Sequence, residues 1–289
     1  MMIWFILILA ILYIMALVGV TVCFVYPFRT PIFLSPGFLG TPQETVEFKD
    51  LGTGKLLRGW WVPHSEPKAV MICCHGFMMN RAELAPFAAR FKNLSMALLF
   101  FDFPAHGASQ GKRSGFGYRE RTAVASAVAE ARKKYPSAKI ILAGSSMGAV
   151  ASAFALSDDP TLADGLILDS CYDRLVEAIN GWWLFLGGKK LRFVLYPVAW
   201  LGGPISGLNP FKVVVSKALS TVKTPTLVLH GTADSLAPLS HAQANFAALA
   251  GPKEMVTFDN RNHSEARWED PDKYFESIEA FLAEQQFLV

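Results

Sequence analysis

Short, uniformly apolar runs alternate along most of this chain with longer stretches of helical spacing. A strand that is apolar at every residue must be buried on both faces, which is typical of a parallel sheet covered by helices. The pattern therefore predicts an α/β fold with a mostly parallel central sheet and helices on both faces. The predicted strands are 45–48, 56–62, 70–74, 96–101, 140–143, 165–168, 226–229 and 255–258, and the predicted helices are 81–91, 119–134, 147–156 and 271–284.

The composition agrees with one large domain of this kind. The chain has 289 residues, of which 52% are hydrophobic and 18% are charged. The net charge of +3 comes from Lys and Arg residues spread along the chain, whereas nucleic-acid binding requires a concentrated basic face. The four cysteines lack the spacing of a disulfide framework or a metal site, and we expect them to be small buried hydrophobes. We therefore expect no nucleic-acid partner, and composition sets no oligomeric state.

Residues 1–26 contain no charged side chain and are mostly Ile, Leu, Val, Met or Phe. At about 1.5 Å per residue, a helix of this length crosses a hydrocarbon core of about 30 Å. Aromatic residues lie near both ends, as at Trp4 and Phe24, and Pro27 ends the helix. The segment is therefore predicted to be a single-pass membrane anchor.

A cleaved signal peptide is the alternative for this segment. It fits less well, because no basic region precedes the apolar run, the run is too long, and no A-x-A-like site follows. Almost no Lys or Arg flanks the segment, so the side of the membrane is not determined. Pro, Gly and Ser residues then predict a linker at 27–43, followed by the main domain at 44–289.

The candidate nucleophile lies in Gly144-Ser145-Ser146-Met147-Gly148, which matches G-x-S-x-G with Ser146 in the middle. A predicted buried strand leads into the motif and a predicted helix leads out of it. This is the context of a sharp strand-to-helix turn that presents a serine hydroxyl in a cleft. The alternative is an ordinary turn of small residues. The predicted strand before the motif and the predicted helix after it favour the nucleophile turn.

A nucleophilic serine needs a base, and the base needs an orienting carboxylate. Asp234 follows the strand at 226–229, and His263 lies in a polar loop after the last strand. Both fall beyond the carboxyl ends of strands, at the sheet edge where Ser146 is expected. The alternatives are a solvated loop histidine and a turn or helix-capping aspartate.

An oxyanion is stabilised by backbone N–H groups, and two positions suit that task. Met147 follows the nucleophile at the start of a helix, and Phe77 follows the strand at 70–74. His75, two residues before Phe77, is predicted to be structural rather than a proton carrier.

The ordered motifs resemble those of the α/β-hydrolase superfamily over essentially all residues after about 44. They are His75-Gly76, the turn 102–109, the motif 144–148, His230-Gly231-x-x-Asp234 and His263. The resemblance implies the α/β-hydrolase fold, a triad of Ser146, Asp234 and His263, Phe77 and Met147 as oxyanion donors, and no cofactor or metal. It also implies that residues 102–109 form a structural turn. Within the superfamily the chain is most similar to membrane-anchored hydrolases of the Bem46 type.

An insertion at 171–215 is too long for a simple crossover, and in this position α/β-hydrolases commonly carry a helical lid. It is rich in aromatic residues and contains Lys189, Lys190 and Arg192. This mixture suits either an apolar acyl pocket and lipid headgroups or simple packing of the lid on the domain. Gly187-Gly188 and Gly202-Gly203-Pro204 interrupt its apolar stretches, so we expect no second membrane span.

These features predict a serine hydrolase that cleaves an ester or thioester, with an apolar small-molecule or lipid acyl substrate. A peptidase or an acyltransferase is the alternative within enzymes, because the triad alone does not select the acyl acceptor. A membrane-tethered binding protein without activity is the alternative from another class.

Overall fold

An eight-stranded sheet forms the centre of the computed structural model, which describes residues 1–288. The strands lie in the order β1-β2-β4-β3-β5-β6-β7-β8, and all neighbouring pairs from β4 to β8 are parallel, whereas β1 and β2 are antiparallel to their neighbours. The predicted mostly parallel sheet is therefore confirmed. The strands are β1 Glu44–Lys49, β2 Leu56–Val62, β3 Ala69–Cys74, β4 Met96–Phe101, β5 Lys139–Ser145, β6 Gly165–Asp169, β7 Thr226–Gly231 and β8 Lys253–Phe258.

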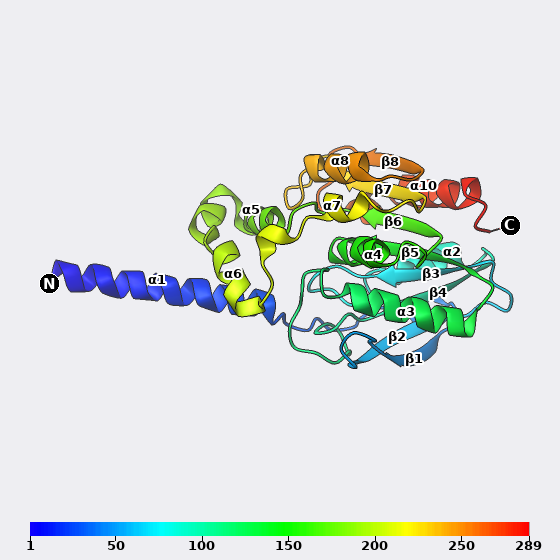
Figure 1. The fold of residues 1–289 in the computed structure, drawn as a ribbon, viewed down its shortest axis with the longest axis horizontal. Coiled ribbons are helices and arrows are strands. Elements are labelled where there is room, and N and C mark those ends of the chain that lie inside the picture. Colours follow the sequence, from blue (N-terminus) through cyan, green and yellow to red (C-terminus); the bar gives the residue numbers. More distant parts are fainter. Residues whose placement is uncertain (289) are drawn as a thin grey trace.

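Helices cover both faces of the sheet, which is why the central strands are apolar at every residue. In β3, Val70 and Ile72 face one core cluster, and Met71 and Cys73 face the other. The first cluster lies under α3 (Arg121–Lys134), α4 (Met147–Asp158), α7 (Val215–Leu219) and α8 (Leu239–Ala248), and the second lies under α2 (Pro86–Phe91), α9 (Ala266–Glu269) and α10 (Pro271–Glu284). Figure 1 shows the sheet between these layers.

The helix predicted at 81–91 begins only at Pro86. Side chains bind the backbone of the preceding residues and hold them in turns. The Arg81 amide donates to Asp102 Oδ1 at 2.8 Å, and the Ala82 amide donates to Asn80 Oδ1 at 2.9 Å. Such local hydrogen bonds compete with helix formation, and apolar spacing alone does not reveal them.

The N-terminal helix α1 (Met2–Val25) projects away from the sheet (Figure 1). Among the described residues it is the one helix that is long and apolar enough to cross a membrane, by length and composition. The last third of α1 packs against the rest of the protein. One face of it is buried there, at Leu17, Thr21 and Val25, which are spaced four residues apart.

The segment predicted to be a linker, 27–43, lies against the domain. Arg29 donates to the carbonyl oxygens of His106 and Gly107 at 3.0 and 2.6 Å, and Asn80 Nδ2 donates to the Thr30 carbonyl at 3.2 Å. A short 3₁₀ helix, η1, spans Gly37–Leu39. The chain between α1 and β1 is therefore held in place by hydrogen bonds.

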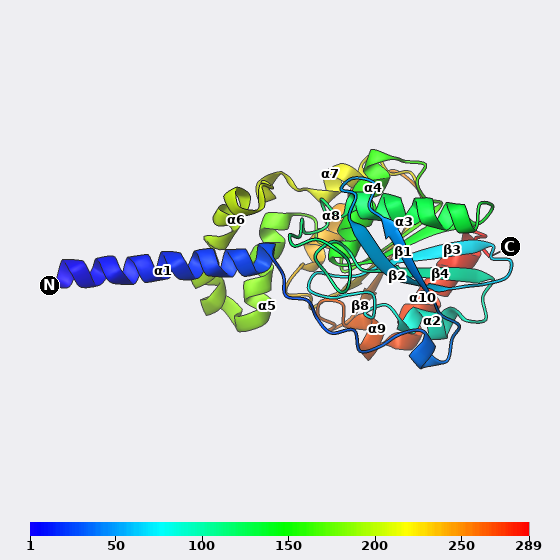
Figure 2. The same ribbon diagram turned by 90° about the horizontal axis from the view of Figure 1, so that it is seen from below.

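Between β6 and α7 the chain forms α5 (Leu175–Leu195), α6 (Val198–Ser206) and a 3₁₀ turn, η2 (Pro210–Lys212). The helical dihedrals of α5 break at Gly187 and Gly188. Figures 1 and 2 show α5 and α6 beside the second half of α1. The predicted insertion is thus helical and contacts the N-terminal helix.

Candidate active site

Ser146 lies at the sharp turn between β5 and α4, and its φ of 49° is rare for a residue with a side chain. The flanking glycines make this turn sterically possible. A Cβ at Gly144 would lie 2.4 Å from the Ala149 amide nitrogen, and a Cβ at Gly148 would lie 2.0 Å from the Cys74 carbonyl oxygen. The G-x-S-x-G pattern therefore follows from the close approach of strand, turn and helix.

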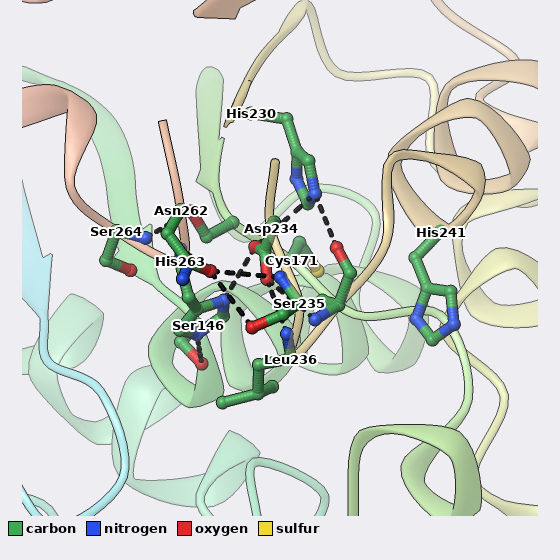
Figure 3. Close-up of polar contacts among 12 residues, drawn as sticks. Ser146, Cys171, His230, Asp234, Ser235, Leu236, His241, Asn262, His263 and Ser264 are labelled. Atoms are coloured by element: carbon green, nitrogen blue, oxygen red, sulfur yellow. Dashed lines mark hydrogen bonds and ion pairs between the residues drawn. The ribbon is translucent and has the colours of Figure 1, made fainter. Parts of the chain in front are cut away.

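His263 lies between Ser146 and Asp234 and contacts both (Figure 3). Its Nε2 is 2.9 Å from Ser146 Oγ, and its Nδ1 is 2.7 Å from Asp234 Oδ2. The three side chains come from the ends of β5, β7 and β8, which meet at one edge of the sheet. This arrangement can transfer a proton from the serine hydroxyl to the imidazole and stabilise the resulting charge.

Two backbone amides fix the Asp234 carboxylate. Its Oδ1 accepts hydrogen bonds from the amides of Leu236 and Ala237 at 2.9 and 2.8 Å, which leaves Oδ2 for His263. His230 Nε2 lies 2.7 Å from the Ala237 carbonyl oxygen. The same nitrogen lies 3.5 Å from Asp234 Oδ2, and burial lowers the pKa of His230, which favours its neutral ring beside the carboxylate.

The loop that contains His263 is anchored on both sides. Asn262 Oδ1 accepts from the amides of Ser235 and His263 at 2.9 and 2.8 Å, and the Ser264 amide donates to Ser170 Oγ at 3.0 Å. These supporting residues could not be predicted from the sequence, because they come from separate segments. Asn262 alone could have been suspected, since it is next to the candidate base.

Phe77 and Met147, the predicted oxyanion donors, lie in two segments next to Ser146. Among the described residues no hydrogen-bond acceptor is found for either amide. A Cβ at Gly76 would lie 3.7 Å from Ser146 Cβ, so the loop before Phe77 passes close to the serine. Both amides are therefore available donors beside the candidate nucleophile.

The contacts of His75 and Asp102 agree with the structural roles expected for them. His75 Nε2 accepts from the Phe103 amide at 2.9 Å, and burial lowers the pKa of His75 to about 4, so its ring is neutral. Asp102 accepts from the amides of Arg81 and Ala108 at 2.8 and 2.7 Å. Both side chains hold backbone turns in place.

A buried charged cluster, which the sequence did not reveal, lies behind the turn of Ser146. Arg267 Nη1 is 3.1 Å from Glu83 Oε1, and its Nη2 is 3.2 Å from Asp169 Oδ2. Glu83 also accepts from the Gly76 amide at 2.6 Å and from Ser145 Oγ at 2.9 Å. The cluster thus joins the Phe77 loop, the serine turn and α9.

Replacing Arg267 by methionine is expected to destabilise the protein by about 3–5 kcal/mol, because two carboxylates would remain buried without their cation. The matched control is Arg58→Met, which removes an exposed ion pair with Glu47 and should cost at most about 1 kcal/mol. Thermal unfolding of both variants in detergent micelles, followed by circular dichroism, measures the difference. Equal shifts in Tm would contradict the importance of the cluster.

Burial lowers the pKa of His106 from 6.5 to about 3, which makes stability pH-dependent. Between these values the unfolded chain binds a proton that the folded chain does not, so His106 destabilises the fold as pH falls below about 6.5, by about 1.4 kcal/mol per pH unit. The variant His106→Phe lacks this group. From about pH 7 to about pH 4.5 we expect the Tm of the wild type to fall further than that of the variant. Parallel curves of Tm against pH would contradict this prediction.

Aromatic side chains pack against Phe77. The ring centroid of Phe24, in α1, is 5.6 Å from that of Phe77 and 4.7 Å from that of Trp183, in α5. The Phe116 ring centroid lies 5.0 Å from that of Phe77. The N-terminal helix and the insertion therefore both contribute apolar surface beside the predicted oxyanion donor.

The chain is similar to known proteins in both sequence and fold. Residues 65–194 match the family described as serine aminopeptidase, S33. The uncharacterized protein YqkD of Bacillus subtilis is 25% identical over 240 residues, which are 78% of this chain and 75% of YqkD. Monoglyceride lipase of Rattus norvegicus is 32% identical over 164 residues, or 54% of each protein. The structure of the Pyrococcus furiosus esterase Pf2001 aligns with a TM-score of 0.76 and 24% identity, over 90% of this chain and 98% of the esterase.

Proposed function

Because the chain has the α/β-hydrolase fold, we propose that it is a serine hydrolase that cleaves carboxylic ester or thioester bonds. The observation that supports this most strongly is the hydrogen-bonded series Ser146–His263–Asp234 at the ends of β5, β7 and β8. The similarity to an esterase and to a monoglyceride lipase supports the same reaction class.

In the proposed reaction, Ser146 Oγ attacks the carbonyl carbon while His263 Nε2 takes the hydroxyl proton. The amides of Phe77 and Met147 donate to the oxyanion of the tetrahedral intermediate. His263 then protonates the leaving alcohol or thiol as the acyl-serine forms. Water, deprotonated by His263, attacks the acyl carbon, and His263 then gives this proton to Ser146 Oγ as the bond to the acyl group breaks and the acid leaves. Asp234 keeps the imidazole oriented throughout.

We also propose that α1 is retained as a single-pass membrane anchor. The packing of Leu17, Thr21 and Val25 supports retention, because cleavage after the segment would expose the core that these side chains cover. Phe24 packs on Phe77 beside the candidate site. The assignment of 171–215 as a lid, the division into anchor, linker and domain, and the Bem46-type similarity remain predictions.

Hydrolysis of p-nitrophenyl esters of graded chain length by the full chain in micelles tests this function. The aromatic side chains packed around Phe77 predict faster hydrolysis of medium or long acyl chains than of acetyl. A clear preference for acetate would contradict an apolar acyl pocket. Absence of hydrolysis of every ester would contradict the proposed function.

A peptidase is the second candidate, because residues 65–194 match a family described as serine aminopeptidase. The same fold and triad suit either reaction. Aminoacyl p-nitroanilides in the same assay separate the two: their hydrolysis in the absence of ester hydrolysis would favour the peptidase.

A further inference from the structure

The part of α1 in which every residue is exposed is too short to cross a bilayer by itself. Every residue from Met2 to Ala16 is exposed, whereas Leu17 is buried. These fifteen residues rise about 22 Å, which is about 8 Å less than the hydrocarbon thickness of about 30 Å. If α1 spans the membrane, some of the protein beside its second half must also lie in hydrocarbon.

The helices at that level are α5 and α6. Tyr13, in the middle of α1, donates its hydroxyl proton to the Val194 carbonyl at 2.6 Å. Helix α6 packs along α1. Figure 2 shows α1 passing between α5 and α6. The insertion therefore lies beside the middle of α1, within the part of that helix that is proposed to cross the membrane.

The outer surface of these helices is apolar. Phe193 is 84% exposed and Trp200 is 63% exposed, with Phe185, Leu186 and Val194 also exposed nearby in the sequence. Two of them, Phe193 and Val194, line a cavity together with Tyr13 of α1. Large exposed apolar side chains on neighbouring helices are typical of a membrane contact.

Three cations lie in the same part of the insertion. Lys189, Lys190 and Arg192 are exposed and follow the break at Gly187-Gly188. Long basic side chains can keep their methylene groups in an apolar layer while their charges reach the phosphates of lipid headgroups. Their position therefore agrees with shallow immersion in one leaflet.

A cavity of about 710 Å³ lies between Tyr13 of α1 and the second half of α5. Apolar and aromatic side chains line most of it, and the two cations Lys189 and Arg192 also line it, together with Tyr13, Leu184, Phe193, Val194, Tyr196 and Pro197. A second cavity of about 420 Å³ shares Leu184, Arg192 and Tyr196 with the first. It extends to Ser235 and Leu236, directly after Asp234. The two cavities thus share part of their lining, and the second reaches the loop that follows Asp234.

We propose that α5 and α6 are immersed with α1 in one leaflet, and that the cavity at Tyr13 admits the acyl chain of a lipid from that leaflet. This inference rests on the proposed function, since it takes the acyl substrate to be a lipid of that leaflet. It predicts that substrates reach the site from lipid rather than from water.

Immersion is tested with nitroxide labels on the full chain in phosphatidylcholine vesicles, in a Cys23→Ser background. Labels at Ile8→Cys and Phe193→Cys should collide with oxygen and be shielded several-fold from a water-soluble nickel chelate. A label at Phe38→Cys, an exposed residue before the first strand, should show the reverse. Shielding at position 8 without shielding at 193 would overturn the immersion, whereas exposure at position 8 would overturn the anchor itself.

The acyl route is tested with Leu184→Trp, which narrows both cavities where they share this residue, and with Leu186→Trp, which changes an exposed neighbour on the same helix. The measured quantity is the rate on monoacylglycerol in vesicles divided by the rate on p-nitrophenyl acetate. Leu184→Trp should lower this ratio about tenfold or more, because a small loss of space in an apolar pocket weakens the fit of an acyl chain by this amount. Leu186→Trp should leave it near the wild-type value. An unchanged ratio in Leu184→Trp would overturn the route, whereas a wild type inactive on both esters would overturn the proposed function.

Discussion

Replacing Asp234 by asparagine is expected to lower kcat about 10⁴-fold, with little change in KM. Asp234 Oδ2 lies 2.7 Å from His263 Nδ1 and accepts its proton in a hydrogen bond. An amide can present its NH₂ group instead, which favours the imidazole tautomer that has its proton on Nε2. That tautomer cannot accept the proton of Ser146. Steady-state hydrolysis of a p-nitrophenyl ester measures the effect.

The fold of Asp234→Asn should persist, because Asn can still accept from the amides of Leu236 and Ala237 through its oxygen. The matched control is Asp259→Asn, an exposed aspartate after β8, which should keep wild-type activity. A loss of less than about tenfold in Asp234→Asn would contradict the assignment of Asp234 as the orienting carboxylate.

Replacing Gly148 by alanine is expected to abolish activity and to reduce stability at or above the roughly 1–3 kcal/mol typical of overpacking. The added Cβ would lie 2.0 Å from the Cys74 carbonyl oxygen and 2.8 Å from that of His75. Backbone on both sides must then separate, which displaces α4 from β3 and moves Ser146 away from the Phe77 loop. Tm and ester hydrolysis in micelles measure the two effects.

The control for this substitution is Gly202→Ala on α6, where a Cβ would meet nothing within 4 Å. Alanine is the better helix former by about 1 kcal/mol, so this variant should be as stable as the wild type or slightly more stable. If Gly148→Ala matched Gly202→Ala in activity and Tm, the close packing at the serine turn would be contradicted.

The sheet and the positions of the three candidate catalytic residues could be predicted from sequence for local reasons. Buried parallel strands are apolar at every residue, and their carboxyl ends meet at one edge. Residues in the loops after such strands, as at Asp234 and His263, therefore lie at the same edge of the sheet as Ser146. The glycines at 144 and 148 could also be recognised, because the turn excludes a side chain at both positions.

The buried cluster of Arg267, Glu83 and Asp169 could not be predicted in the same way. Its members come from three segments far apart in the sequence, and each alone resembles a surface charge. The packing of Leu17, Thr21 and Val25 was hidden for a similar reason, since apolar residues in a membrane helix and in a protein core look alike in sequence. These features depend on tertiary partners rather than on local pattern.

Covalent labelling by a fluorophosphonate probe, with the modified residue identified by mass spectrometry, tests the central claim most directly. If Ser146 is the nucleophile, the wild type carries the adduct on Ser146 and Ser146→Ala carries none. Ser157→Ala, which removes another serine of α4, should label like the wild type. Labelling of Ser146→Ala as strong as that of the wild type, or an adduct on another serine, would contradict the proposed mechanism.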